Sequence, residues 1–176
     1  ADDNTLTGLI TLAANSEIQI DTGSSLTLNP TSGNAITGTY NLTIESVGTS
    51  SINDPIAIST GNIIKTGAGT LTLSGTNTYS GDTTISAGTI KLTGSVNALT
   101  DLTIASGATL DLQSTQTFAT LDLDGTITRT ANTSALTITG ASDIGGSITT
   151  SGTQDYEGAI TLTSNTTLVS GDQITF

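Results

Sequence analysis

The chain has 176 residues and a net charge of −12, and it contains no Cys, His, Met or Trp. Without Cys or His it cannot form a Ser-His-Asp or Cys-His catalytic group, a zinc finger or a disulfide framework. Its only basic residues are Lys65, Lys91 and Arg129, too few for the cationic patch that neutralises nucleic-acid phosphates. We therefore predict no nucleic-acid partner.

Four small polar residue types dominate the composition, since Thr, Ser, Gly and Asn supply 91 of the 176 residues. Such a bias is also typical of disordered chains. However, Ile, Leu, Val and Phe supply 42 residues, which is above the roughly one-fifth of the chain below which disorder is the better interpretation. The arrangement of these apolar residues then favours a folded chain.

Apolar–polar–apolar triplets recur along the whole chain and are separated by turns rich in Gly, Asn, Asp and Ser. Alternation with period two predicts β-strands with one buried and one exposed face, and the β-branched residues Ile and Thr favour strands. In chain order the triplets are 18–20, 26–28, 42–44, 56–58, 71–73, 90–92, 102–104, 110–112, 121–123, 136–138, 160–162 and 174–176. No stretch shows a helical repeat.

The strands also recur at a longer period of about 20 residues, which is typical of solenoids. One series is Ile20, Ile44, Ile64, Ile85, Ile104 and Leu123, and a second is Leu73, Leu92 and Leu112. We predict an all-β fold, a parallel β-helix (β-solenoid) forming a single domain over residues 1–176. It has roughly eight coils of about 20 residues, stacked about 4.8 Å apart, with Ile and Leu inward and Thr in outward ladders. The period becomes less regular after Leu123.

Segment 63–92, which reads IIKTGAGTLTLSGTNTYSGDTTISAGTIKL, resembles the passenger-associated repeat of bacterial autotransporters. The matching residues are Lys65, Gly67, Gly69, Leu71, Leu73, Gly75, Asn77, Tyr79, Gly81, Thr84, Ile85, Gly88 and Ile90. Residues 155–162 and 165–168 are similar to strand repeats of haemagglutinin-like exoproteins. The resemblance implies a right-handed β-helix that is secreted by a Gram-negative bacterium and displayed at its surface. It also implies an adhesin, biofilm component or stalk, with glycans or host or bacterial surfaces as partners.

Paired carboxylates are the one route to acid–base chemistry that the composition leaves open. Asp122 and Asp124 alternate with leucines and are expected to point outward together, with Asp111 below or beside Asp122. Lyases and hydrolases of anionic sugars also need nearby cationic groups, which are scarce here. We interpret these residues as solvated surface charge and predict no catalytic residue and no enzyme activity.

The acidic residues also contain fragments of a calcium site. Asp122, Asp124 and Gly125 resemble part of a calcium loop, and Asp2 and Asp3 form an acidic cluster. A complete loop needs more oxygen ligands and an acidic residue at its end. We therefore predict no metal ligands and no cofactor. The glycine-containing segment 67–69 is not a phosphate-binding loop either, because it precedes a strand rather than a helix.

The remaining polar and aromatic candidates have structural explanations. Asn41, Asn132 and Asn165 fit the glycosylation acceptor pattern, but Asn41 and Asn165 are expected at turns. The aromatic residues are Tyr40, Tyr79, Tyr156, Phe118 and Phe176. They could form a platform for sugars, although we expect Tyr79 to pack within a turn of the repeat.

The two ends leave a choice between a fragment of a longer passenger and a protomer of a longer assembly. The sequence shows no signal peptide or membrane-spanning run, and Phe176 ends the chain inside an alternating strand. An open end exposes unpaired backbone, so copies could stack end to end into a filament.

Three functions therefore remain open besides the filament. The first is a non-enzymatic adhesin or fibre, and the second is a carbohydrate-active β-helix enzyme. The third is an ice-binding solenoid, which needs Thr-x-Thr on one face in successive coils. The triplets 70–72, 126–128 and 137–139 have this form, but their spacing is not one coil.

Overall fold

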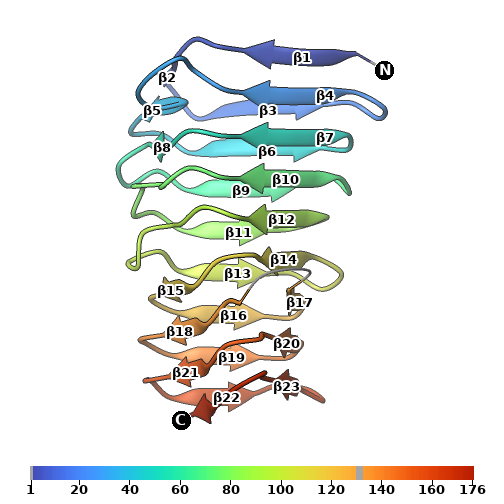
Figure 1. The fold of residues 1–176 in the computed structure, drawn as a ribbon, viewed down its shortest axis with the longest axis vertical. Helices are drawn as coiled ribbons and strands as arrows, with labels where there is room; N and C mark the ends of the chain where they lie inside the picture. Colours follow the sequence, from blue (N-terminus) through green and yellow to red (C-terminus); the bar gives the residue numbers. More distant parts are fainter. Residues whose placement is uncertain (1, 130–132) are drawn as a thin grey trace.

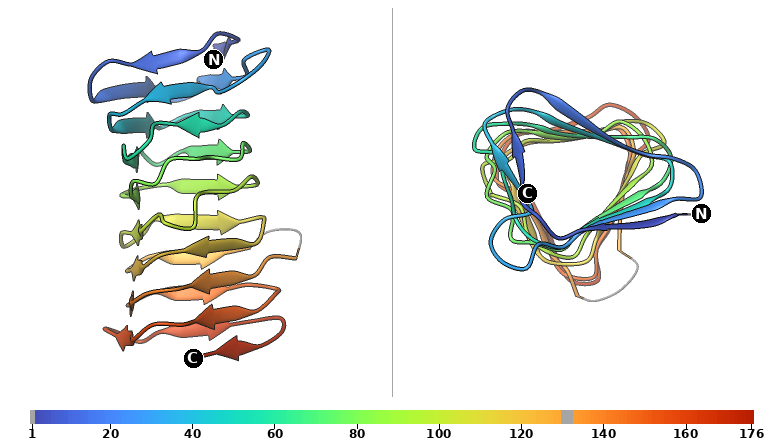
Figure 2. Two further views of the ribbon diagram at one scale, coloured as in Figure 1. Left: turned by 90° about the vertical axis from the view of Figure 1, so that its left-hand side faces the viewer. Right: turned by 90° about the horizontal axis from the view of Figure 1, so that it is seen from above.

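The computed structural model describes residues 2–129 and 133–176, and within them every regular element is a β-strand. The strands form parallel sheets that wind around one axis, so the two termini lie at opposite ends of a rod (Figure 1). Viewed along the axis, the coils superimpose on a roughly triangular outline (Figure 2). The predicted all-β parallel β-helix is thus confirmed.

Two sides of the triangle are long parallel sheets. The nine-stranded sheet contains β1 (Asp3–Leu6), β4 (Ser25–Leu28), β7 (Thr49–Ile52), β10 (Thr70–Leu73), β12 (Thr89–Leu92), β14 (Thr109–Leu112), β17 (Thr126–Thr128), β20 (Ser147–Thr149) and β23 (Thr167–Val169). The eight-stranded sheet contains β3 (Ser16–Ile20), β6 (Leu42–Ser46), β9 (Ile63–Thr66), β11 (Thr83–Ile85), β13 (Leu102–Ile104), β16 (Leu121–Leu123), β19 (Ser142–Ile144) and β22 (Ile160–Leu162). Nine strands are separated by eight steps, which agrees with the predicted eight coils.

The third side is shorter and is built from two separate sheets. One contains β2 (Ile10–Leu12), β5 (Ile36–Gly38) and β8 (Ile56–Ala57), and the other contains β15 (Gln116–Phe118), β18 (Leu136–Ile138), β21 (Gln154–Tyr156) and β24 (Ile174–Thr175). Between the two sheets, a single parallel bridge joins Thr76 to Ser95. Other contacts must therefore hold this part of the third side together.

The coil is right-handed. In Figure 1 the front strands of the nine-stranded sheet run from right to left, and the strands behind them run from left to right, while the chain descends. This is the hand that parallel strands joined by crossovers adopt almost without exception.

The hydrophobic core is a column of side chains that the parallel register stacks coil upon coil. Leu73 pairs with Leu92, and Leu92 pairs with Leu112, as the second predicted series requires. In the eight-stranded sheet Ile104 pairs in the same way with Leu123. All five side chains are buried, so each coil gains its apolar contacts mainly from its two neighbours.

The first part of the other predicted series is wrong in register. Ile44 stacks between Ile18 and Lys65, whereas Ile20 pairs with Ser46. The inward position that the prediction gave to an isoleucine is therefore filled by a lysine. The last apolar residue of a strand is therefore not always the one in register with the inward residues of neighbouring coils.

Ile64, the next residue of that series, lies half-buried on the outer face. The coils differ in length, which explains why a period of about 20 residues predicts the wrong direction for Ile64. Successive strands of one sheet are offset by as few as 17 and as many as 26 residues, so the period alone does not assign the inward residue. Beyond Leu123 the register continues through Ile144 to Leu162.

Candidate functional surfaces

Lys65 is fully buried in β9, inside the segment that resembles a passenger repeat. The three N–H groups of its ammonium are shared among four backbone carbonyls, those of Ser46 at 3.3 Å, Thr66 at 2.5 Å, Gly67 at 2.7 Å and Ala87 at 3.3 Å. Because these carbonyls belong to three successive coils, Lys65 fastens one corner of the solenoid. Desolvation by burial lowers the pKa of Lys65 to about 8.

Asn77 has a similar role on the third side, where strand pairing is interrupted. Its side-chain amide donates to the carbonyls of Gly75 at 3.1 Å and Ser95 at 2.9 Å, and its Oδ1 accepts from the Ile56 N–H at 2.9 Å. Asn77 is buried, and its side chain adds to the backbone hydrogen bonds at this point, where the Asn77 N–H donates to the Ser95 carbonyl at 2.8 Å and the Ser95 N–H donates to the Gly75 carbonyl at 3.1 Å. It therefore connects three coils.

The other prominent residues of the segment also build the coil. The buried Tyr79 hydroxyl lies 2.8 Å from the Thr83 hydroxyl, which confirms its packing role, and burial raises the pKa of Tyr79 to about 12. Gly67 and Gly88 turn successive corners with φ of 71° and 70°, a conformation that favours glycine. These contacts of the segment are thus structural.

A ladder of side-chain amides stabilises the corner before the eight-stranded sheet. The Oδ1 of Asn15 accepts from the Asn41 N–H at 3.0 Å, that of Asn41 from the Asn62 N–H at 2.9 Å, and that of Asn62 from the Asp82 N–H at 2.9 Å. Four successive coils are joined in this way. The ladder explains why Asn recurs in the sequence.

The asparagines that fit the glycosylation pattern lie in loops where the structure describes them. Asn41 lies immediately before β6, and Asn165 lies between β22 and β23, so both are at turns as predicted. Asn132 lies outside the described residues.

The carboxylates are arranged differently from the prediction. Asp122 and Asp124 are exposed on the outside of the eight-stranded sheet, as expected. Asp111, however, lies in the nine-stranded sheet with Lys91 as its register partner, so its predicted position next to Asp122 is wrong. The register neighbour of Asp122 is instead Asp143. Alternation predicts the outward direction of a residue but not which sheet it belongs to.

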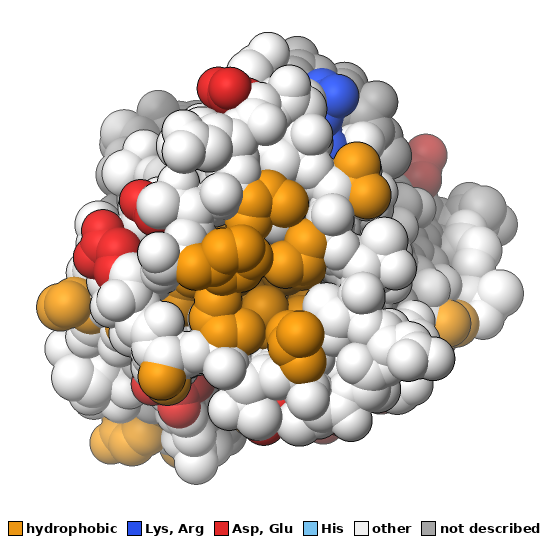
Figure 3. Space-filling view, turned by 90° about the horizontal axis from the view of Figure 1, so that it is seen from below, with side chains coloured by type: hydrophobic (Ala, Val, Ile, Leu, Met, Phe, Trp, Pro, Cys, Tyr) orange, Lys and Arg blue, Asp and Glu red, His pale blue; other side chains and the backbone are white. Residues whose placement is uncertain are grey.

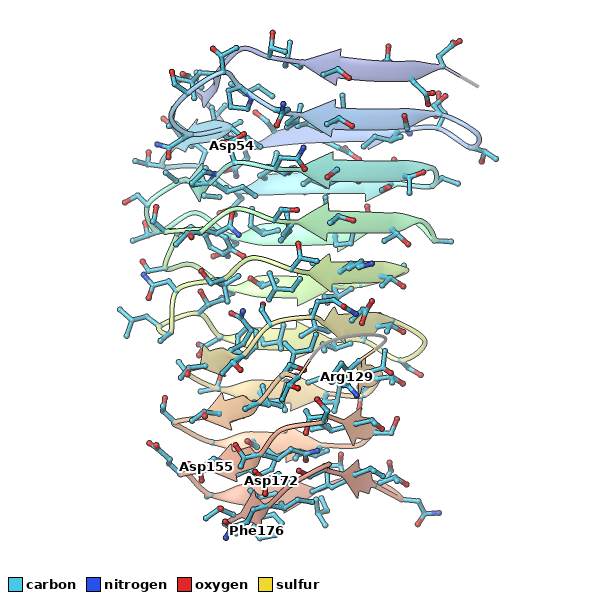
Figure 4. The ribbon with its side chains drawn as sticks, viewed as in Figure 1. Asp54, Arg129, Asp155, Asp172 and Phe176 are labelled. Atoms are coloured by element: carbon cyan, nitrogen blue, oxygen red, sulfur yellow. The ribbon has the colours of Figure 1, made fainter. Side chains whose placement is uncertain are left out.

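The acidic residues are spread along the rod. Figure 4 shows Asp54 on an upper coil and Asp155 and Asp172 on lower coils. Within residues 2–129 and 133–176, no three Asp, Glu, His or Cys residues come together in a group that could hold a metal ion. In the N-terminal acidic cluster, Asp3 accepts a hydrogen bond from the Ser25 hydroxyl at 2.7 Å.

The aromatic side chains do not form a shared platform for sugars. Phe118, Tyr79 and Tyr156 are buried, while Tyr40 is partly exposed. Phe176 stacks on Tyr156 with 5.8 Å between the ring centroids. Their main contribution is therefore to packing.

The outside of the nine-stranded sheet carries a row of hydroxyl residues, one from each strand after β1. We call it the outer hydroxyl row; it consists of Ser25, Thr49, Thr70, Thr89, Thr109, Thr126, Ser147 and Thr167, which are aligned by the strand register. Two residues further along each strand, a second row begins with Thr5, Thr27, Ser51 and Thr72 and continues with Lys91 and Asp111. The uninterrupted part of the second row thus ends at β10.

The Thr-x-Thr triplets are not one coil apart, as predicted, but single hydroxyl residues of the strands between them complete the outer hydroxyl row. The triplets 70–72 and 126–128 lie in the same sheet, as β10 and β17, and the strands between them place Thr89 and Thr109 in the outer hydroxyl row. The triplet containing Thr137 belongs to β18 on the third side. Variable coil lengths concealed the row in the sequence.

The C-terminal end of the rod presents the open side of the last coil. Strands β22, β23 and β24 are the outermost members of their sheets. Figure 3 shows a hydrophobic patch in the middle of this end. The hydrophobic side chains of the last strands include the partly buried Ile160, Leu168 and Ile174 and the exposed Leu162 and Phe176.

Comparison with known families gives one match. Residues 63–92 match the passenger-associated-transport-repeat family, the same segment that carries Lys65, Asn77 and Tyr79. Comparison of the chain with curated proteins and with solved structures gives no match. In the part of the chain that the structure describes, no helix could span a membrane.

Proposed function

We propose that this chain belongs to the passenger of a secreted, autotransporter-like surface protein of a Gram-negative bacterium, and that it serves as a non-enzymatic adhesive rod. The main support is that the passenger-associated repeat at 63–92 is an integral part of the solenoid that the described residues form. Its most distinctive polar residues, Lys65 and Asn77, are used to connect coils. What remains for function is the outer surface of a long, rigid rod.

Binding of the purified chain to arrays of glycans and extracellular-matrix proteins tests the adhesive role. We expect saturable binding to at least one surface, and a heat-unfolded sample serves as the control for adsorption of a polar, acidic chain. Absence of saturable binding across a broad array would contradict an adhesive role. Cleavage of pectin, alginate or polygalacturonate that disappears in Asp122→Asn would contradict the non-enzymatic part.

A second candidate, a subunit of an extracellular filament, is favoured by the hydrophobic end in Figure 3. A second copy would place β1, β2 and β3 against β23, β24 and β22, and it would thereby continue all three sides of the solenoid. Contacts of this head-to-tail kind do not close and so generate fibres.

Light scattering and electron microscopy of matched variants test this stacking. Phe176, exposed at the end, and Leu99, exposed elsewhere, have 77% and 69% of their surface accessible. Phe176→Asp is expected to abolish filaments, because it places a charge in an apolar contact, whereas Leu99→Asp should leave them intact. Monodisperse parent protein at all concentrations would rule out the filament.

A further inference from the structure

The outer face of the nine-stranded sheet has an uncharged area over β4, β7 and β10, flanked by Asp3 on one side and by Lys91 and Asp111 on the other. On β4, β7 and β10 the outward residues are all Ser or Thr, and they include Thr27, Thr49 and Thr70. The outward residues of the eight-stranded sheet include Glu17, Glu45, Asp122 and Asp143. In a chain of net charge −12, this neutral area fits a neutral partner.

Five of the threonine hydroxyls on this face are free to bind, whereas the hydroxyls of Ser25, Ser51 and Ser147 donate to Asp3, Asn53 and Thr126. Thr49, Thr70, Thr72, Thr89 and Thr109 are exposed or half-buried, and the structure gives none of their hydroxyls a protein hydrogen-bond partner within the described residues. Such groups are solvated and can exchange water for another hydrogen-bonding surface.

The geometry of the face is periodic in two directions. Parallel strand pairing repeats the hydroxyls about every 4.8 Å along the rod, and the pleat repeats them about every 6.7 Å across it. Seven steps separate the eight members of the outer hydroxyl row, which is therefore roughly 34 Å long. Because the strand backbone sets the spacing between neighbouring hydroxyl groups, their pattern is rigid.

We infer that the outer hydroxyl row and the adjoining Thr27, Ser51 and Thr72 bind the surface of ice. Each single hydroxyl contact is weak, so only a partner with its own periodic lattice can engage many of them at once. Water oxygens on the prism faces of hexagonal ice form such a lattice, with repeats similar to those of the sheet. The outward positions of β4, β7 and β10 also lack aromatic side chains, so this face offers no flat apolar surface for a sugar ring.

The ice-binding inference goes beyond the proposed adhesive function and does not depend on it, because it concerns the purified chain in solution. The test uses single ice crystals grown in near-millimolar protein. Their shape is observed, and the suppression of their growth is measured as thermal hysteresis. We expect faceted crystals and a measurable hysteresis gap. Absence of both for the folded parent chain would overturn the inference, and binding of this face to a polysaccharide without any effect on ice would also overturn it.

Two tyrosine substitutions test which face is responsible. Thr70 and Thr84 are both half-buried, outward-facing threonines, one in the nine-stranded and one in the eight-stranded sheet. Thr70→Tyr places a ring above the row and should reduce hysteresis by at least about tenfold, while Thr84→Tyr should leave it unchanged. Tyr is favourable in strands, and unchanged thermal melting verifies folding. Equal effects of the two substitutions would overturn the assignment to this face.

A third substitution covers the case in which Thr70→Tyr fails to fold. Thr49 is an exposed member of the outer hydroxyl row, so Thr49→Lys adds a charge without disturbing packing. The same loss of hysteresis is expected for Thr49→Lys. Full hysteresis in a folded Thr49→Lys chain would contradict the inference.

Discussion

Replacing Gly88 by Ala is expected to reduce the free energy of unfolding by about 3–5 kcal/mol, since it combines backbone strain with a steric clash. Gly88 has φ of 70°, which costs an L-residue roughly 1–2 kcal/mol. A Cβ atom at this position would also lie closer than 3.0 Å to the carbonyl oxygens of Gly67 and Gly69 in the preceding coil. Those carbonyls cannot retreat without disturbing the corner that Lys65 fastens.

Gly107 provides a matched control at the equivalent corner one coil later. Its φ is 80°, close to that of Gly88, but a Cβ atom there would meet nothing within 4 Å. Gly107→Ala should therefore cost only the strain of the backbone, about 1–2 kcal/mol. The difference between the two substitutions isolates the close approach of neighbouring coils.

Urea unfolding followed by circular dichroism measures both variants. We expect a clearly larger decrease in the midpoint for Gly88→Ala than for Gly107→Ala. Repeat arrays can lose cooperativity, so the midpoints should be compared together with the slopes of the transitions. Equal midpoints for the two variants would contradict the proposed clash.

The sequence predicts the architecture of this protein well because two different periodicities are visible in it. The alternation within each triplet separates buried from exposed residues, and the recurrence of Leu73, Leu92 and Leu112 reveals the stacking of coils. Both signals come from the same requirement, namely that every inward side chain packs on its equivalent in the next coil.

The residues whose direction cannot be predicted from the sequence are those that break the alternation of buried apolar and exposed polar residues. Lys65 lies in the core because four carbonyls compensate its charge, and no pattern of hydrophobicity anticipates such a site. Ser50 and Ser142 also occupy inward positions. The outer hydroxyl row is hidden in the sequence for another reason, because coils of unequal length obscure which threonines share a face.

Stability of this protein is expected to rise by about 2 kcal/mol between pH 7 and pH 10, because Lys65 binds its proton less tightly when folded. Burial lowers the pKa of Lys65 from 10.5 to about 8. Between these two values the unfolded chain binds more protons than the folded chain, so raising the pH favours folding. The four carbonyl acceptors keep the folded state intact while the ammonium is still charged.

Above pH 10 the trend should reverse. Burial raises the pKa of Tyr79 from 10.0 to about 12 and raises that of Tyr156 as well. Unfolding then releases protons from both phenols, which favours the unfolded chain as the pH increases. The free energy of unfolding should therefore pass through a maximum at about pH 9–10.

Urea titrations at a series of pH values compare the parent chain with two lysine variants. Lys65→Met keeps the length of the side chain and removes the titrating group, so the rise between pH 7 and pH 10 should disappear while the decline above pH 10 remains. Lys91, which lies on the outside of β12, is the control, and Lys91→Met should preserve the rise. If Lys65→Met does not fold, the Nζ chemical shift of Lys65 in the parent chain reports its pKa directly. A value at or above 10.5, or a rise that persists in folded Lys65→Met, would show that the buried ammonium is not what makes this solenoid more stable in alkali.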